Sequence, residues 1–197
     1  ANTIRLYQNQ SNSAKIAPEG REIFGGRKYF RFLKTKKTLI IMSIMNIEAK
    51  LSDLGIELPE PSIPPGASLR AWNMSGNLIY LSGAGPTDAS GNTPIGKVGR
   101  DFDVVEAQAF ARSIAVNHLG VLKTALDDLD RVMQVVKVLG MVNCTEDFTD
   151  QPAVINGYSE FFVELWGENG RHARSAVGMG QLPGGMPVEI EAIIEFL

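Results

Sequence analysis

Two charged residues near the end of the chain, Arg174 and Glu189, have side chains suited to chemistry on a small anionic molecule. The planar guanidinium of an arginine can hold a carboxylate through two parallel hydrogen bonds. A positioned glutamate can transfer protons as a general acid or base beside a bound water. The pair therefore suggests a site in which the arginine anchors an acid and the glutamate activates water.

Each of these residues also has a simpler interpretation. An arginine on a strand commonly forms ion pairs at the surface or at a subunit interface. Glu189 is one of three acids on a single strand, together with Glu191 and Glu195, and all three could be solvated. The residue pattern alone does not separate Glu189 from Glu191.

The elements that must position the two residues are strands. Residues 173–182 are small and apolar, and Leu182-Pro183-Gly184-Gly185 supplies turn-forming residues. In residues 188–195, apolar side chains alternate with mostly acidic ones, which is typical of a strand with one buried face. The sequence therefore predicts a closing β-hairpin with Arg174 and Glu189 on its two strands.

The rest of the pattern predicts the element order ββαβαββ. A short helix is expected at 46–55, followed by a proline-rich extended connector and by two strands, 68–75 and 77–83, that are joined at Gly76-Asn77. After a loop at 83–99, a helix is expected at 104–126, with a capping box formed by Asp103 and Glu106. A strand at 131–142 and a helix at 150–166 follow. This order implies an α+β fold, a mixed sheet with two helices packed on one face. The second face of the sheet then needs a cover, which self-association could supply.

Composition favours one globular domain at residues 45–197. The chain has 197 residues, is 44% hydrophobic and has no apolar run long enough to span a bilayer. Its single cysteine, Cys144, excludes an internal disulfide and a cysteine-rich metal site. We expect a reducing, cytoplasmic location.

The first 44 residues differ from the rest in charge. Residues 1–41 hold nine basic and two acidic residues, a net charge of +7, which leaves −10 for the remainder of a chain with a net charge of −3. Such a segment could be an interaction arm, an organelle-targeting segment or sequence outside the natural reading frame. We favour a disordered, non-core extension, and the acidic remainder argues against nucleic acid as a partner.

The other residues that could do chemistry have simpler interpretations. His118 falls on the apolar stripe of a helix and His172 lies beside two arginines, so both are interpreted as packing or surface residues without metal-ligand spacing. Cys144 is interpreted as a passive thiol at a strand end. The glycine-rich stretch at 83–91 lacks the lysine and the strand-to-helix placement of a phosphate-binding loop. These residues therefore do not indicate a metal site or a nucleotide-binding loop.

Three segments in their order along the chain resemble the RidA family, also called YjgF/YER057c/UK114. These are GNLIYLSGAGP at 76–86, ARSAVGMGQLP at 173–183 and PVEIEAI at 187–193. The resemblance covers roughly residues 57–197.

The resemblance implies a chorismate-mutase-like fold and a homotrimer with active sites in the clefts between subunits. It also implies hydrolysis of reactive 2-imino acids or enamines to 2-keto acids and ammonia, without metal or organic cofactor. The family's arginine and glutamate fall on Arg174 and Glu189. Its substrate-binding positions fall on Ser82, Gly83, Asn156 and Ala176.

This sequence departs from the family in three places. A tyrosine of the imine-hydrolysing branch falls near Ser68 or Leu69, a frequent cysteine is Ala176, and Gln151-Pro152 are expected to lengthen the approach to the second helix. These departures suggest a side branch of the family. A non-catalytic, trimeric ligand-binding or regulatory protein is therefore an alternative function, and an endoribonuclease is another.

Overall fold

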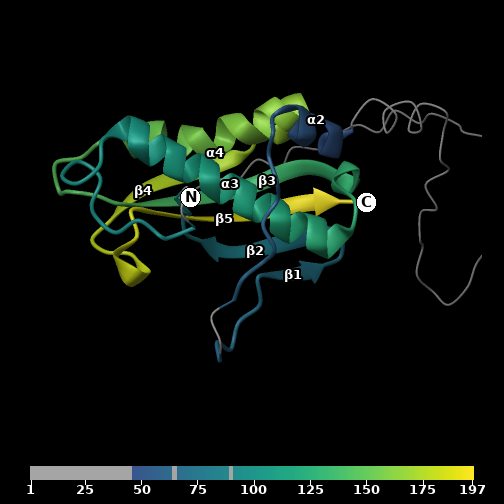
Figure 1. Cartoon of the computed structure of the whole chain (residues 1–197), viewed down its shortest axis with the longest axis horizontal. Coiled ribbons are helices and arrows are strands. Elements are labelled where there is room, and N and C mark those ends of the chain that lie inside the picture. Colours follow the sequence, from purple (N-terminus) through teal and green to yellow (C-terminus); the bar gives the residue numbers. More distant parts are fainter. Residues whose placement is uncertain (1–45, 64–65, 89–90) are drawn as a thin grey trace, which may run out of the picture. The chain divides into compact units, whose positions relative to one another are not determined.

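The computed structural model describes residues 46–63, 66–88 and 91–197 (Figure 1). The basic segment at 1–44 lies outside the described residues. The described helices are α2 (Ile47–Asp53), α3 (Val104–Leu126) and α4 (Gln151–Trp166), with short 3-10 turns at Leu129–Arg131, Gly167–Gly170 and Pro183–Gly185. The described strands are β1 (Trp72–Ser75), β2 (Leu78–Ala84), β3 (Val132–Asn143), β4 (Ala173–Met179) and β5 (Val188–Phe196). α2 lies within the short helix predicted at 46–55, and the elements after it follow the predicted order ββαβαββ.

The five strands form one mixed sheet in the order β1-β2-β5-β3-β4. β1 and β2 are the predicted first hairpin, in which Ser75 pairs with Leu78 and Gly76 adopts a φ of 62°. Glycine reaches this left-handed conformation without the steric cost that a side chain would add. β1 is shorter than predicted, because residues 68–71 lie outside the strand.

The predicted closing hairpin is wrong, because β4 and β5 are not neighbours. β3 lies between them: Val138 pairs with Arg174 of β4 in parallel and with Ala192 of β5 in antiparallel orientation. β3, α4 and β4 form a strand–helix–strand crossover, the connection that parallel neighbours require. The chain after β4 then crosses the end of β3, where the backbone N–H of Asn143 donates to Pro187 O at 2.9 Å.

The long helix α3 begins and ends where the sequence predicts. Glu106 N donates to the Asp103 side chain at 2.8 Å, and Asp103 N donates to the Glu106 carboxylate at 2.9 Å. This reciprocal pair satisfies two backbone donors at the helix start. Gln151 and Pro152, expected to lengthen the approach to α4, are instead its first two residues, since proline is well tolerated in a first helical turn.

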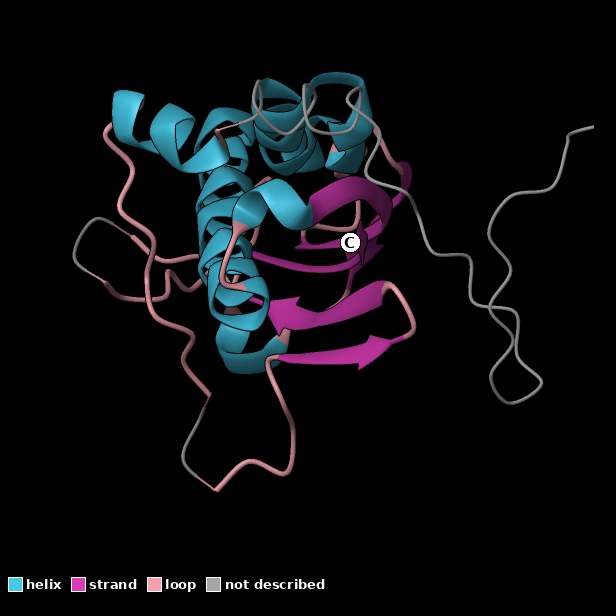
Figure 2. Cartoon of the chain, turned by 90° about the vertical axis from the view of Figure 1, so that its right-hand side faces the viewer, coloured by secondary structure: helices cyan, strands magenta, loops and turns pink. Residues whose placement is uncertain are grey.

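Both long helices cover the same face of the sheet, and the opposite face carries no helix of the described chain (Figures 1 and 2). α3 and α4 approach closely at Gly157, where a Cβ atom would overlap the backbone oxygen of Gln108. α4 reaches the sheet at Gly140, which lies against the side chain of Ile155. The helices and the buried sheet face enclose the core.

Residues 56–63 of the proline-rich connector contain no helix or strand, and Pro59 contacts α3 at Gly120. A Cβ atom on Gly120 would overlap the carbonyl oxygen of Pro59, so this contact depends on a glycine in the helix. In the described ranges, no helix combines the length and apolar character needed to cross a membrane.

Candidate functional site

Arg174 lies on the edge strand β4 and turns its side chain toward α4. Its Nη1 donates to Asn156 Oδ1 at 2.9 Å and to Ser159 Oγ at 3.0 Å, and its Nη2 donates to the carbonyl of Pro152 at 3.3 Å. Asn156 and Ser159 are three residues apart on α4, a spacing that brings them to one helix face. One helix therefore holds the guanidinium from one side.

His172 extends this set of hydrogen bonds. Its Nδ1 lies 2.8 Å from the carbonyl of Gly170 and its Nε2 lies 3.0 Å from Ser159 Oγ. A carbonyl can only accept, so Nδ1 carries the proton and Nε2 accepts from the serine hydroxyl. Arg174 therefore donates to Ser159, and Ser159 donates to His172. Because the serine proton points to His172, the serine oxygen is oriented to accept from the guanidinium.

The guanidinium retains donors that the protein does not use. Its three partners are neutral oxygens, and no carboxylate of the described residues forms an ion pair with it. An arginine has five N–H donors, so Nε and one proton of Nη2 have no partner in the described ranges. Partial burial lowers the pKa of Arg174, and Glu160 opposes this effect, but a guanidinium stays charged at neutral pH. The guanidinium of Arg174 is thus a positive charge fixed in position by three hydrogen bonds, with two N–H donors available for an anion.

Glu189 lies on the other face of the sheet. It pairs with Met141 on β3, on the face away from α3 and α4, and its carboxylate lies directly against Gly83 of β2. Partial burial raises the pKa of this carboxyl group, and the nearby charge of Glu191 raises it further. A raised pKa suits a general acid or base that must exchange protons near neutral pH.

Ser82 and Gly83 form an irregularity in β2 beside Glu189. The pairing with β5 shifts between Leu81, which faces Ala192, and Ala84, which faces Ile190. Two residues of β2 therefore face one residue of β5, which is a β-bulge. The Ser82 hydroxyl donates to Arg70 O at 2.6 Å and its N–H to Ala71 O at 3.0 Å, so this residue ties β2 to the segment before β1.

The residues expected in one site fall into two groups in a single chain. Arg174, Asn156 and Ala176 lie at the β4 edge on the helix-covered side, where Ala176 packs against the core. Ser82, Gly83 and Glu189 lie at β2 and β5, with Glu189 on the open side.

The alternation of side chains along the strands separates Arg174 from Glu189. Arg174 shares its face of the sheet with its partner Val138, whereas Glu189 shares the opposite face with Met141. One chain does not bring Arg174 and Glu189 together.

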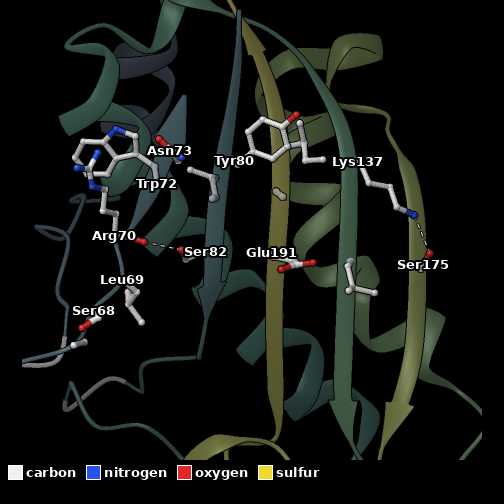
Figure 3. A pocket seen from close by; sticks show the side chains of 15 residues that line it. Ser68, Leu69, Arg70, Trp72, Asn73, Tyr80, Ser82, Lys137, Ser175 and Glu191 are labelled. Atoms are coloured by element: carbon white, nitrogen blue, oxygen red, sulfur yellow. Dashed lines mark hydrogen bonds between the residues drawn. The ribbon is translucent and has the colours of Figure 1, made fainter. Parts of the chain in front are cut away.

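A hollow of about 770 Å³ lies on the open face, between the sheet and the segment before β1 (Figure 3). Ser82 and Glu191 line it, as do three residues that the sequence interpretation did not select: Tyr80, Lys137 and Ser175. Lys137 Nζ donates to Ser175 Oγ at 2.8 Å across β3 and β4. The period-2 pattern of β2 places Tyr80 on the same face as Ser82, so this one residue could have been found from the sequence.

The other residues whose side chains could do chemistry have hydrogen-bond partners within the protein. Within the described ranges, Glu48, Asp128 and Asp130 place oxygens within 4.8 Å of one another. Glu48 accepts from Lys123 and from the N–H of Leu129, and Asp130 accepts from the N–H of Ile47. These carboxylates therefore cap backbone groups.

Two further expectations concern packing. His118 is buried at 1% exposure within the core, as its place on the apolar stripe of a helix predicts. Cys144 is a buried, free thiol just after β3.

The fold and the two groups of residues define a chorismate-mutase-like α+β domain. Residues 48–188 match the family described as "YjgF/chorismate mutase-like, putative endoribonuclease". The chain therefore belongs to the YjgF/RidA family.

Three relatives show how far the similarity extends. The chain is 40% identical to protein TCP17 of Trypanosoma cruzi over 76% of this chain and 93% of that protein. It is 40% identical to the crystal structure of Atu1372, a protein of unknown function from Agrobacterium tumefaciens, with a TM-score of 0.70, covering 83% of this chain and 100% of the other. A "putative endoribonuclease" from Shewanella oneidensis is 27% identical, with a TM-score of 0.71, covering 76% of this chain and 99% of the other.

Proposed function

We propose that the protein hydrolyses reactive 2-imino acids, or their enamine tautomers, to 2-keto acids and ammonia. The observation that carries the proposal is the held guanidinium of Arg174, which has neutral partners and two unused donors. Such a group can bind the carboxylate of a 2-imino acid side-on and fix the position of C2. Membership of the YjgF/RidA family supports the same reaction.

The chemistry after binding needs proton transfer and no redox step. A water oxygen bonds to C2 of the imine, one water proton passes through Glu189 to the nitrogen, and a tetrahedral carbinolamine with a hydroxyl and an amino group results. The remaining hydroxyl proton then passes through Glu189 to the amino nitrogen while the C=O double bond forms and the C–N bond breaks, which releases ammonia and the 2-keto acid. The raised pKa of Glu189 favours both directions of this transfer. The imine carbon is already electrophilic, so anchoring and proton transfer are the contributions required of the protein.

In this proposal the protein is a homotrimer in which Arg174 of one subunit meets Glu189 of a neighbouring subunit. The separation of the two groups within one chain supports this arrangement, because a complete site then needs two copies. Ser82 and Gly83 would line the cleft from the Glu189 side, while Asn156 and the backbone of Ala176 would line it from the Arg174 side. The open sheet face would be covered by the other subunits.

The first experiment measures ammonia release from freshly generated 2-iminopropionate and 2-iminobutyrate. Wild-type protein should accelerate release, and Arg174→Ala should abolish the acceleration. Arg171→Ala is the matched control, because Arg171 forms an exposed ion pair with Glu168 and should keep full activity. Equal rates with and without wild-type protein would reject the proposal.

A second experiment tests the shared site. Arg174→Ala and Glu189→Gln are each expected to be inactive alone. When the two variants are unfolded together and refolded as mixed trimers, about one quarter of the sites receive an intact Arg174 and an intact Glu189 from different subunits. Recovery of about a quarter of wild-type activity supports the inter-subunit site, and no recovery contradicts it.

A non-catalytic ligand-binding protein is the second candidate function. The observation that favours it is the absence of a phenol at Ser68 and Leu69, the segment expected to hold the tyrosine of the imine-hydrolysing branch. In that case 2-keto acids should raise the Tm of the wild type and not of Arg174→Ala, with no ammonia release by either. An endoribonuclease is suggested by the descriptions of the family and of the Shewanella oneidensis protein, and cleavage of RNA by residues 45–197 would be needed to support it.

A further inference from the structure

His118 is a buried polar residue of α3 with hydrogen-bond partners on α4 and on β2, the strand that holds Ser82 and Gly83 beside Glu189. Its side chain is enclosed by the core, at 1% exposure. Its Nδ1 lies 2.8 Å from the hydroxyl of Tyr158 on α4, and its Nε2 lies 3.2 Å from the carbonyl oxygen of Ser82 on β2. One imidazole thus links α3, α4 and the bulge of β2.

The partners define the tautomer. The carbonyl of Ser82 can only accept, so Nε2 carries the proton. In a neutral imidazole Nδ1 then accepts, and the Tyr158 hydroxyl donates to it. Burial lowers the pKa of His118 to about 4, so the ring stays neutral at physiological pH and does not transfer protons to a substrate.

Every polar group of Ser82 is bound by a different neighbour. Its hydroxyl donates to Arg70 O, its N–H donates to Ala71 O, and its carbonyl accepts from His118 Nε2. In a regular strand a carbonyl lies in the sheet plane and bonds an adjacent strand. Here the carbonyl is directed toward a helix, at the bulge where two residues of β2 face one residue of β5.

This direction has a consequence for Gly83. The peptide bond between Ser82 and Gly83 is trans, so its C=O and N–H point in opposite directions. Because the carbonyl is directed toward α3, the N–H of Gly83 is directed away from α3. The Glu189 carboxylate lies against Gly83 on the open face of the sheet.

We propose that His118 is a positioning residue that orients the Ser82–Gly83 peptide, so that the Gly83 N–H faces the site beside Glu189. The effect of this orientation on catalysis rests on the proposed function. The orientation of the peptide itself does not depend on that function and can be measured directly. His118 touches no substrate in this arrangement and acts through Gly83.

Three variants of His118 separate positioning from simple core packing. Glutamine places an amide N–H near the former Nε2 and can still donate to Ser82, whereas asparagine reaches only the Nδ1 position near Tyr158. Leucine fills the space and donates to neither. Tyr158→Phe is the matched control, because it removes the other hydrogen bond of the same ring and leaves the contact with Ser82 in place.

The two readouts are steady-state kinetics with 2-iminobutyrate and the ¹H–¹⁵N signal of the Gly83 amide. We expect His118→Leu and His118→Asn to shift the Gly83 signal and to lower kcat about tenfold or more, with KM within about twofold because Arg174 is untouched. We expect His118→Gln to restore both the signal and most of kcat. Tyr158→Phe should lower the Tm and leave kcat and the Gly83 signal near wild type.

Two results would overturn the inference. One is a His118→Gln variant as impaired as His118→Leu, and the other is a Gly83 signal that is the same in all four variants. If the wild type releases no ammonia, the proposed function fails, and the Gly83 signal still decides whether His118 orients the peptide. The two claims can therefore fail separately.

Discussion

Gly83 lies directly against the carboxylate of Glu189, so close that a Cβ atom at residue 83 would overlap Glu189 Oε1. The overlapping atom is the far end of a flexible side chain, which can move away without disturbing the backbone. The glycine is therefore needed for the position of the carboxylate more than for the fold.

Gly83→Ala is expected to lower kcat about 100-fold, the scale of loss that a displacement of about 1 Å causes at a catalytic group. Its Tm should stay close to that of the wild type. Ammonia release and thermal unfolding measure the two effects. Gly180→Ala is the control, since a Cβ there would meet nothing within 4 Å. A Gly83→Ala protein with full activity would mean that Glu189 has no positioned role.

Ser159→Ala is expected to raise KM for 2-imino acids about fivefold, with kcat little changed. The hydroxyl accepts from Arg174 Nη1 and is oriented by His172, so its loss leaves the guanidinium less fixed. One hydrogen bond of this kind contributes about 1 kcal/mol, which corresponds to roughly a fivefold change in affinity. Ser113→Ala on α3 should leave KM unchanged, because the Ser113 hydroxyl donates to Phe110 O and accepts from Thr87 N and is not a partner of Arg174. An unchanged KM in Ser159→Ala would contradict the role of the α4 residues in holding Arg174.

Glu189→Gln is expected to be inactive and no less stable than the wild type at neutral pH. The folded-state pKa of Glu189 is raised above the ordinary value of 4.5, so the folded state holds this proton more tightly than the unfolded state. The contribution of this group to stability is therefore present below pH 4.5 and is lost as the pH rises through the folded-state pKa. Because the carboxylate is partly solvated, we expect the gain in Glu189→Gln to stay below about 1 kcal/mol.

Urea unfolding of Glu189→Gln and wild type at pH 4 and pH 7 measures this difference. The two proteins should have closely similar stability at pH 4 and diverge at pH 7 in favour of the variant. A variant that is clearly less stable at pH 7 would show that the carboxylate makes a stabilising contact.

The sequence predicts the faces of the strands better than their neighbours. Alternation in residues 188–195 correctly separates buried Val188 and Ile190 from Glu189 and Glu191, because burial depends on side-chain type. The insertion of β3 between β4 and β5 was missed, because a proline-glycine turn permits a hairpin without enforcing one. The strand–helix–strand order at residues 132–179 was the available signal for parallel pairing.

The candidate site, like the sheet, could be predicted from the sequence only in its residue types and not in the way that they are brought together. Residue types identify an arginine and a glutamate, but their faces depend on register, and only the paired strands show that Arg174 and Glu189 lie on opposite sides. The hydrogen bonds of His118 to Tyr158 and Ser82 join three elements far apart in sequence. No local pattern contains such a contact, so His118 could be predicted to be buried but not to have these partners.

Acid is expected to destabilise the wild type through His118. Its pKa is about 4 when folded and 6.5 as the ordinary value, so the unfolded state takes up a proton first as the pH falls. Stability from this group is complete above pH 6.5 and is lost as the pH falls toward 4, with a total of about 3 kcal/mol.

His118→Gln does not titrate in this range, so its stability should fall less between pH 7 and pH 4.5 than that of the wild type. Urea unfolding at several pH values in this range measures the difference. Parallel profiles for the two proteins would show that another group controls the acid response.

The position of β5 has a consequence for how the protein is made. This strand lies in the middle of the sheet and is the only link between the β1-β2 pair and the β3-β4 pair, although it is the last strand of the described chain to be synthesised. On the ribosome the nascent chain can form its first hairpin and its strand–helix–strand unit, but these two pieces share no sheet until residues 188–196 emerge. Each piece exposes unpaired strand edges during that interval. Translation speed and chaperone access near the end of synthesis should therefore govern the yield of this protein more than they would for a sheet completed in chain order.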